Sequence, residues 1–510
     1  MKKLALILTL ALCLTSFGGF AALAEEEPVE LYYVDRYGAH EWETTVLWDI
    51  LEEKFNVNIV RKPYAAVDGS TWFTLAILSG DTPAYIADLS TAEMVNYARQ
   101  GLFKPLDIEM IKEYAPNMYE WWADEWIENW EDFATVDGTL YAVPVLWSLS
   151  NHWNTVAIRE DICEELGMEV PHTLDDLEAF MAAAKEAYEM DYVMSVSGDA
   201  YLNFVLGAYD VYRGGFYLGN DSELYWWTYH PNAKAAVSRL ADWYAKGYID
   251  PEFITNDASM VTERWASGKS LVGVSYWPDF VEAGTWGSND GAMLAALKEA
   301  NPDAKVAWVG TPSSDQGNGG WISDPWTAWF VFSNELTDEQ MIKYWQCFDY
   351  CSQTYEGLLY ATKGIEGVHY TVDDDYNFTW LEAADTDEER EALGIGVNFP
   401  ENFNNYTAQY PFSTSNSMSE NRHFWEDNNY TRSNILAATN RELWNDWGTS
   451  FEDYCDKNFI DFVTGARSLD EWDAFIEELN TQYHGLELME EAQTTLDSVG
   501  VIVDKYEENE

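Results

Sequence analysis

Aromatic and carboxylate side chains carry the chemistry of this sequence. It has 25 Trp, 32 Tyr and 23 Phe among 510 residues, so aromatic side chains make up 16% of the chain. Flat indole and phenol faces cover the C–H faces of sugar rings, while carboxylates and amides bind the hydroxyl groups. A sugar-binding site needs both kinds of side chain on loops. This composition therefore favours a carbohydrate ligand.

The candidate ligand-binding residues follow predicted strands or lie where the chain is expected to cross between lobes. They are Asp35, Tyr37, His40, Ser90, Trp147, Asn151, Trp153, Asp199, Tyr201, Trp277, Asp279, Trp321, Asp324 and Trp326. For any one Trp, packing is the commoner role, because burying so large an apolar surface is favourable anywhere. Trp122, Trp126 and Trp130 recur every four residues and indicate a packed helix face.

No catalytic or metal site emerges from the motifs. A glycosidase needs two carboxylates at a fixed separation, and 89 acidic residues make chance pairs inevitable. Asp175-Asp176 fits helix capping, and Asp373–Asp375 lacks the spacing of a calcium loop. H-E-x-x-H, G-x-S-x-G and P-loop patterns are also absent from the sequence. We therefore expect no cofactor, no metal and no enzyme, although a secreted glycoside hydrolase and a binder of peptides or other small molecules stay open as alternatives.

The net charge of −61 restricts the partners. It argues against nucleic acid, anionic membrane surfaces and anionic ligands, since these require clustered Lys and Arg. Neutral or cationic small molecules remain.

The first 24 residues read as a secretory signal peptide. Lys2 and Lys3 precede the apolar run Leu4–Leu14, and Ala22-Leu23-Ala24 predicts cleavage before Glu25. Leu12 stands where lipoproteins carry a small residue before a lipidated cysteine, so Cys13 is interpreted as unmodified, with a lipid anchor at Cys13 left open as the alternative. We expect a secreted protein at the outer face of the cell membrane. The four remaining cysteines are interpreted as buried free thiols: Cys163, Cys347, Cys351 and Cys455.

Strands and helices alternate in the first third of the chain. Strands are expected at 29–34, 57–61 and 85–89, with helices at 42–55 and 70–78 between them. Such alternation predicts a mainly parallel sheet with helical cover, which binds ligands beyond the carboxyl ends of its strands. Further strands are expected at 270–276, 305–309 and 327–332. Thr173 resembles the start of a capping box and predicts a helix with Leu174, Leu177 and Phe180 on its apolar face.

Several ordered motifs resemble those of extracellular solute-binding proteins of ABC importers, the large sugar-binding type of Gram-positive bacteria. They are the turn Leu78–Pro83, the corner Gln100–Leu106, the run Asp137–Pro144, the segment Arg159–Asp176, the loop Gly364–Tyr370 and the helix opening Thr464–Phe475. Ala84 departs from the family pattern, which has Asp there.

The resemblance implies an α/β fold of the type II periplasmic-binding-protein kind, with two lobes and a hinged cleft. Residues 25–147 with 270–332 are expected to form the N-terminal lobe, and 148–269 with 333–510 the C-terminal lobe. It also implies a monomer that captures a neutral carbohydrate, an oligosaccharide in this family, and delivers it to the permease of an ABC importer.

Overall fold

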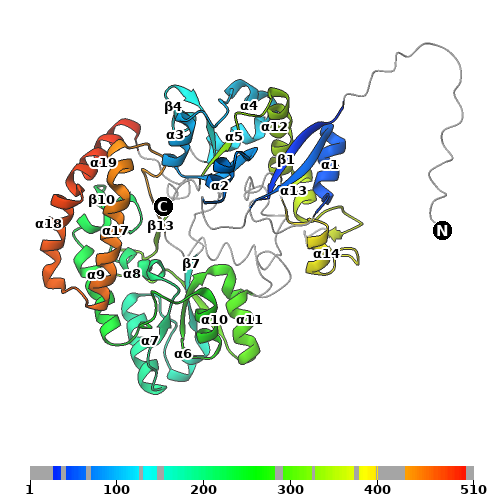
Figure 1. Ribbon diagram of the computed structural model, residues 1–510. Helices are drawn as coiled ribbons and strands as arrows, with labels where there is room; N and C mark the ends of the chain where they lie inside the picture. Colours follow the sequence, from blue (N-terminus) through cyan, green and yellow to red (C-terminus); the bar gives the residue numbers. More distant parts are fainter. Residues whose placement is uncertain are drawn as a thin grey trace, which may run out of the picture.

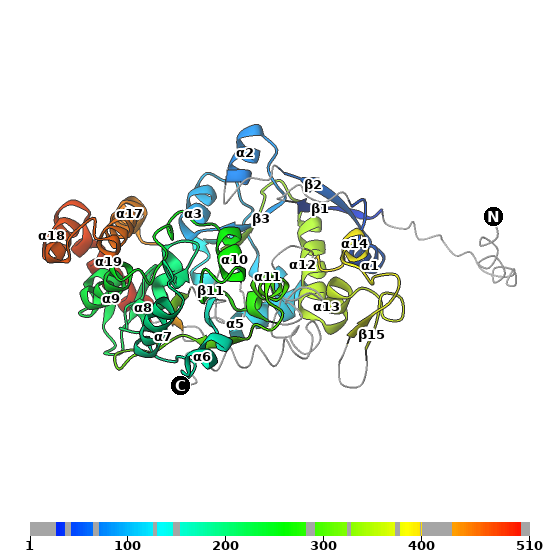
Figure 2. The same cartoon turned by 90° about the horizontal axis from the view of Figure 1, so that it is seen from below.

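The computed structural model describes residues 27–35, 42–64, 71–125, 130–145, 154–281, 291–323, 328–372, 378–397, 399 and 431–500. Figure 1 shows two α/β bodies, one above the other, with a group of C-terminal helices beside them, and the view from below in Figure 2 shows these helices together at one end of the molecule. The signal peptide and Cys13 lie outside the described residues. Across the described part, no helix is long and apolar enough to span a membrane.

The first lobe is built on a three-stranded sheet and a two-stranded ribbon. The sheet has the order β3-β14-β6, and the ribbon joins β1 to β2 in parallel. Their bounds are β1 Val29–Asp35, β2 Val57–Pro63, β3 Tyr85–Leu89, β6 Ala142–Val145 and β14 Ala328–Phe332. The helices of this lobe are α1 Val46–Phe55, α2 Thr71–Ser79, α3 Thr91–Arg99, α4 Ile108–Tyr114, α5 Pro116–Glu125, α12 Asp338–Gln353, α13 Tyr355–Thr362 and α14 Asp387–Ala392.

The second lobe is built on a four-stranded sheet of order β12-β7-β11-β8. Its strands are β7 Asn154–Arg159, β8 Met194–Ser195, β11 Val272–Tyr276 and β12 Val306–Gly310. Its helices are α6 Glu160–Leu166, α7 Leu174–Ala187, α8 Asn203–Gly207, α9 Ala233–Ala245, α10 Ala258–Ala266, α11 Ala292–Ala300, α17 Glu442–Thr464, α18 Trp472–Gln482 and α19 Gly485–Val499. Short ladders join β4 Thr135–Val136 to β5 Thr139–Leu140, β9 Phe216–Leu218 to β10 Leu224–Trp226, β15 Tyr370–Val372 to β16 Phe378–Trp380, and β13 Trp321–Ser323 to β17 Thr431–Ser433.

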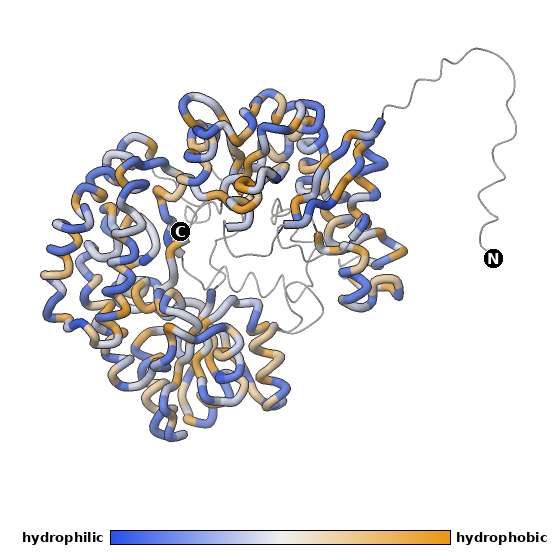
Figure 3. The backbone as a smooth tube through the Cα atoms, in the orientation of Figure 1, coloured by the Kyte–Doolittle hydropathy of each residue, from blue (hydrophilic) through white to orange (hydrophobic). Residues whose placement is uncertain are grey.

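Local signals explain where these helices begin. The Thr45 hydroxyl accepts a hydrogen bond from the Trp48 amide and starts α1, and Ser90 forms a capping box with Glu93 at α3. Thr173 accepts from the Asp176 amide and starts α7 as predicted, with Leu174, Leu177 and Phe180 buried. Each apolar face then packs on a sheet, so the hydropathy-coloured tube in Figure 3 places its hydrophobic segments mainly inside each lobe.

One strand in each sheet runs against the others. β14 is antiparallel to both β3 and β6, and β7 is antiparallel to both β11 and β12, whereas β8 and β11 are parallel. The reversed strands are those by which the chain arrives from the other lobe. Such a strand begins at the edge of the sheet that faces the other lobe. Its neighbours end at that same edge, so the entering strand runs antiparallel to them. The expected α/β architecture is confirmed, but the expectation of mostly parallel sheets is wrong for strand pairing: the entering strand lies between the others, so among the described strands only β8 and β11 pair in parallel within these two sheets.

The lobes divide differently from the sequence-based division. β11 and β12 pair with β7 and belong to the second lobe, although residues 270–332 had been assigned to the first. Of that range, β14 returns to the first sheet. Residues of α12, including Tyr344 and Phe348, pack in the first core rather than the second. Periodicity identifies a strand or helix but does not say which sheet it joins, which explains the difference.

Candidate functional site

The strand directions bring several candidate residues to the edge of each sheet that faces the other lobe. In the first lobe, β6 ends at Val145, which pairs with Ala328 at the start of the entering strand β14. In the second, β11 ends at Tyr276, which pairs with Asn154 at the start of β7. The carboxyl ends of the other strands lie at these same edges, and ligands of open α/β sheets bind there.

Asp35 and Ser90 occupy this edge in the first lobe. Asp35 ends β1 and is buried, with 2% of its surface exposed, and its Oδ2 lies 2.8 Å from the Nε of Arg61. The Ser90 hydroxyl donates to the Glu93 carboxylate (2.8 Å) within the capping box of α3. Both side chains therefore already have partners that hold them in place at the strand ends.

A cluster around Tyr201 occupies the corresponding edge of the second lobe. Tyr201 follows β8, while Tyr276 ends β11 and Asp279 follows it directly. Burial, with Tyr276 and Asp279 nearby, raises the pKa of the Tyr201 hydroxyl. These three residues thus converge from two neighbouring strands of one sheet.

Tyr276 and Asp279 give this cluster an aromatic face and an acceptor. Tyr276 is 53% exposed, which is high for an aromatic side chain at the end of a buried strand. Asp279 accepts a hydrogen bond from the hydroxyl of Ser275, and burial raises the pKa of its carboxyl against that bond. An open aromatic ring beside a desolvated carboxyl is the pairing that binds a sugar ring and its hydroxyl groups.

Asp199, two residues before Tyr201 in the sequence, belongs to an ion-pair network. It pairs with the guanidinium of Arg213, which is also 3.0 Å from Asp456 (Nε to Oδ1) and donates to Asn203 Oδ1 at 3.3 Å. Arg213 is buried, with two carboxylates and an amide around it. Its charge is therefore compensated within the protein.

Trp277 and Trp321 are buried in this structure. Trp277 is 2% exposed and packs against Trp308, with ring centroids 6.0 Å apart. Trp321 is 3% exposed; its indole donates to the carbonyl of Ala200 (3.2 Å) and packs against Phe204. Trp321 thus supports the backbone next to Tyr201.

Seven of the candidates lie outside the described residues: Tyr37, His40, Trp147, Asn151, Trp153, Asp324 and Trp326. The Asp373–Asp375 run also lies outside them. Sequence reasoning missed Tyr276, and the one signal for it was its place as the last residue of the predicted strand at 270–276, where burial falls from Val274 to the exposed Tyr276. Within the described ranges, no group of three or more His, Cys, Asp or Glu side chains could hold a metal ion.

Comparisons with known proteins place this geometry in context. A family model described as bacterial extracellular solute-binding protein matches residues 47–345. The fructooligosaccharide ABC transporter substrate-binding protein FusA of Streptococcus pneumoniae is 27% identical over 227 residues, which is 41% of this chain and 42% of that protein. The polygalacturonan/rhamnogalacturonan-binding protein YtcQ of Bacillus subtilis is 23% identical over 319 residues, or 60% of each chain. The matches therefore span less than two thirds of either relative.

Solved structures of similar fold cover nearly the whole chain. FusA of S. pneumoniae in complex with kestose has a TM-score of 0.68 at 17% identity and covers 92% of this chain and 99% of its own. The alginate-binding protein AlgQ2 without calcium ion has a TM-score of 0.67 at 16% identity, covering 92% and 98%. At these identities the likeness shows a common two-lobe α/β fold.

Proposed function

Because this chain belongs to the family of bacterial extracellular solute-binding proteins, we propose that it captures a neutral oligosaccharide between its lobes and delivers it to an ABC importer permease. The observation that supports a carbohydrate ligand is the cluster of Tyr201, Tyr276 and Asp279, which lies where the strands of the second sheet end. Tyr276 supplies the stacking face and Asp279 the hydroxyl acceptor. Asp35 and Ser90 occupy the facing edge of the first lobe.

The charges around these residues favour a neutral ligand. Arg213 is compensated by Asp199 and Asp456, and Arg61 by Asp35. Neither guanidinium is left to pair with the carboxylate of a uronic acid. A neutral sugar needs no such partner, since hydroxyl groups hydrogen-bond to carboxylates and tyrosine hydroxyls.

The protein acts by binding and release rather than by turnover in this proposal. Greater affinity of the ligand for the closed arrangement of the lobes drives closure. The leading segment directs the chain out of the cell, where the importer collects its solutes. Two relatives with named ligands, kestose for FusA and polygalacturonan for YtcQ, suggest one neutral and one anionic probe.

Thermal unfolding with added ligand tests the proposal. A ligand at about 100 times its Kd stabilises the native state by about 2.7 kcal/mol, so the midpoint should rise with kestose-type neutral oligosaccharides and stay unchanged with oligogalacturonates and peptides. Chromatography of the mixture should recover the sugar intact. A response to peptides alone, or release of shorter sugars, contradicts the proposal and supports the peptide binder or the hydrolase.

The substitution Tyr276→Ala tests the site. Loss of a stacking partner worth about 0.5–1.5 kcal/mol should weaken sugar binding about 2- to 12-fold by isothermal titration calorimetry. Tyr355→Ala is the matched control, because Tyr355 is 46% exposed at the start of α13 in the first lobe. Equal affinities for the two variants would remove Tyr276 from the site while leaving solute capture itself standing.

A further inference from the structure

The first lobe contains a gap between β1 and the rest of its sheet. The ribbon's partner on that side is a set of side chains instead of a strand: the Tyr344 hydroxyl accepts from the Tyr32 amide (2.7 Å) and donates to the Tyr32 carbonyl (2.9 Å). Tyr85 accepts from the Val34 amide at 3.0 Å, and Gln340 donates to the Glu30 carbonyl at 2.9 Å. These side chains hold β1 away from β3, so the sheet is open here.

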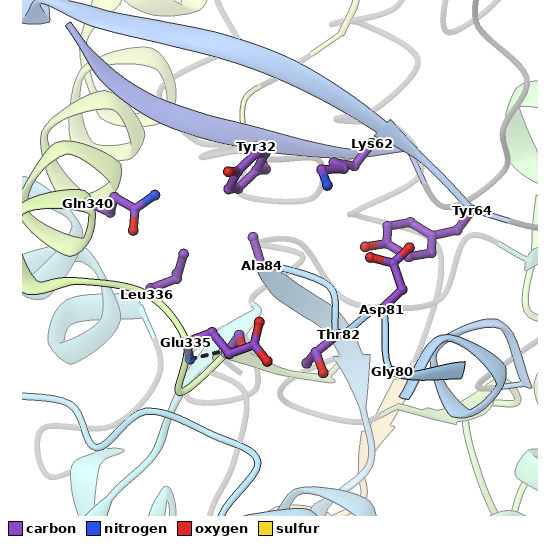
Figure 4. A pocket seen from close by; sticks show the side chains of 11 residues that line it. Tyr32, Lys62, Tyr64, Gly80, Asp81, Thr82, Ala84, Glu335, Leu336 and Gln340 are labelled. Carbon is purple, nitrogen blue, oxygen red and sulfur yellow. Dashed lines mark hydrogen bonds between the residues drawn. The ribbon is translucent and has the colours of Figure 1, made fainter. Parts of the chain in front are cut away.

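A cavity of about 250 Å³ lies along this gap (Figure 4). Tyr32 and Lys62 line it from the ribbon, and Thr82 and Glu335 face them from the far side, with Tyr64 and Asp81 near one end. Sites for drug-sized ligands measure about 300–1,000 Å³, so this cavity suits a smaller molecule. All of its lining residues belong to the first lobe, so the cavity is separate from the Tyr201 cluster of the second lobe.

Charges of both signs face the cavity without pairing to one another. Among the residues that the structure describes, Lys62, Asp81 and Glu335 take part in no ion pair, although Lys54, Lys104, Lys112, Lys246, Lys305 and Lys457 each have a carboxylate partner. The Lys62 ammonium lies 5.0 Å from the Tyr32 ring centroid. Burial, with Asp81 and Glu335 close by, raises the pKa of the Tyr64 hydroxyl well above its usual range.

This charge arrangement defines the ligand. We propose that the cavity binds a small zwitterion of the α-amino-acid class, with its carboxylate on Lys62 and its ammonium between Asp81 and Glu335. A simple anion would pair only with Lys62, and a simple cation only with the two carboxylates, whereas a zwitterion pairs with all three charges. Charge-assisted hydrogen bonds at both ends are the strong kind, and the hydroxyl groups of Tyr64 and Thr82 lie in reach of the polar backbone of such a molecule. This site is separate from the proposed oligosaccharide site.

Isothermal titration calorimetry of the full chain against the twenty common L-α-amino acids tests the proposal. At least one should bind with a Kd below about 1 mM, while its decarboxylated amine and its N-acetyl derivative bind at least about tenfold more weakly. Lys62→Met should weaken binding of the amino acid at least about tenfold and leave binding of the amine unchanged. The double variant Asp81→Asn, Glu335→Gln should also weaken binding of the amino acid, but it should leave binding of the N-acetyl derivative unchanged. Lys112→Met, a surface lysine elsewhere in this lobe, is the control and should bind as the parent does.

Several results would overturn this site. They are no binding by any amino acid, equal binding of the amine or of the N-acetyl form, unchanged binding in Lys62→Met, or displacement of the amino acid by kestose. The charged residues exchanged are exposed, so thermal midpoints of the variants should match that of the parent. Kestose binding should be the same in parent and Lys62→Met, which separates failure of this site from failure of the proposed function.

Discussion

The substitution Tyr344→Phe should loosen the β1–β2 ribbon from the first lobe. Tyr344 is fully buried on α12, and its hydroxyl supplies both the acceptor for the Tyr32 amide and the donor for the Tyr32 carbonyl. Removing one oxygen leaves the ring in place among Tyr85, Phe332, Phe348 and Phe399. The change therefore isolates the two hydrogen bonds from packing.

The magnitude follows from what the two backbone groups lose. A net hydrogen bond contributes about 0.5–1.5 kcal/mol, and a buried donor or acceptor left without a partner costs about 1–3 kcal/mol. Both bonds are part-buried, so water can compensate in part. We expect the free energy of unfolding to fall by about 1–3 kcal/mol, with the amide of Tyr32 exchanging faster.

Urea unfolding followed by tryptophan fluorescence measures the free energy, and hydrogen exchange with mass spectrometry reads out the ribbon. Tyr350→Phe is the matched control on the same helix, since its hydroxyl donates to the carboxylate of Glu356, whose side chain is 61% exposed. That control should lose less than Tyr344→Phe does, because the exposed Glu356 carboxylate can bind water once the Tyr350 hydroxyl is gone, whereas the Tyr32 backbone groups lose both of their bonds to the hydroxyl of Tyr344. If both variants lose the same amount, or if exchange in Val29–Asp35 is unchanged, the hydroxyl does not hold the ribbon and the reasoning fails.

Two further changes probe the second lobe. Burial raises the pKa of Asp279, so the folded protein holds this proton more tightly than the unfolded chain; its stabilising contribution is present at acidic pH and lost as pH rises from 3.8 through the raised pKa. In urea unfolding, the free energy of unfolding of Asp279→Asn should therefore rise relative to that of the parent as pH increases across that window. Above the window the difference between the two proteins should stay constant, and a difference that is the same at every pH would contradict this. The Lys185 ammonium donates to the carbonyls of Met190 (2.8 Å) and Asp191 (2.6 Å), so Lys185→Met should lower the free energy of unfolding by about 1–2 kcal/mol and speed hydrogen exchange in 188–192. Unchanged exchange there would show that the ammonium does not fix the turn.

Local signals in the sequence predicted local structure well. The strands expected at 29–34, 57–61 and 85–89 end within two residues of β1, β2 and β3, because apolar runs bounded by turn residues mark strands directly. The capping pattern at Thr173 is confirmed by the bond from the Asp176 amide. The expectation of four buried free thiols is confirmed as well, since all four cysteines are at most 1% exposed. The family resemblance, which rested on scattered motifs, is confirmed by the family match.

Features that depend on two distant segments could not be predicted in this way. Trp277 follows a strand as a ligand-binding Trp should, yet Trp308 of β12 covers it. Tyr276, one residue earlier, is 53% exposed in the structure. Whether an aromatic ring is open or covered depends on the neighbouring strand, and the sequence of one strand does not contain that information. The roles of the candidate residues thus stay predictions for the binding assays.

The path of the chain brings the lobe crossings to the region of the candidate ligand-binding residues. Val145, where β6 ends, pairs with Ala328, where β14 begins, so the described ends of two crossings meet in one ladder. β13 and β17 form a second, parallel ladder. In the sequence, β13 comes before β14 and β17 comes before Ala438, and both β14 and Ala438 pack in the core of the first lobe. Connections that are hydrogen-bonded to one another can bend together but cannot separate, which favours a single hinge over independent movement of each strand. Because the entering strands begin at the edges where the other strands end, bending near these ladders would bring Asp35 and Ser90 toward Tyr276, so the proposed closure would act on the candidate ligand-binding residues.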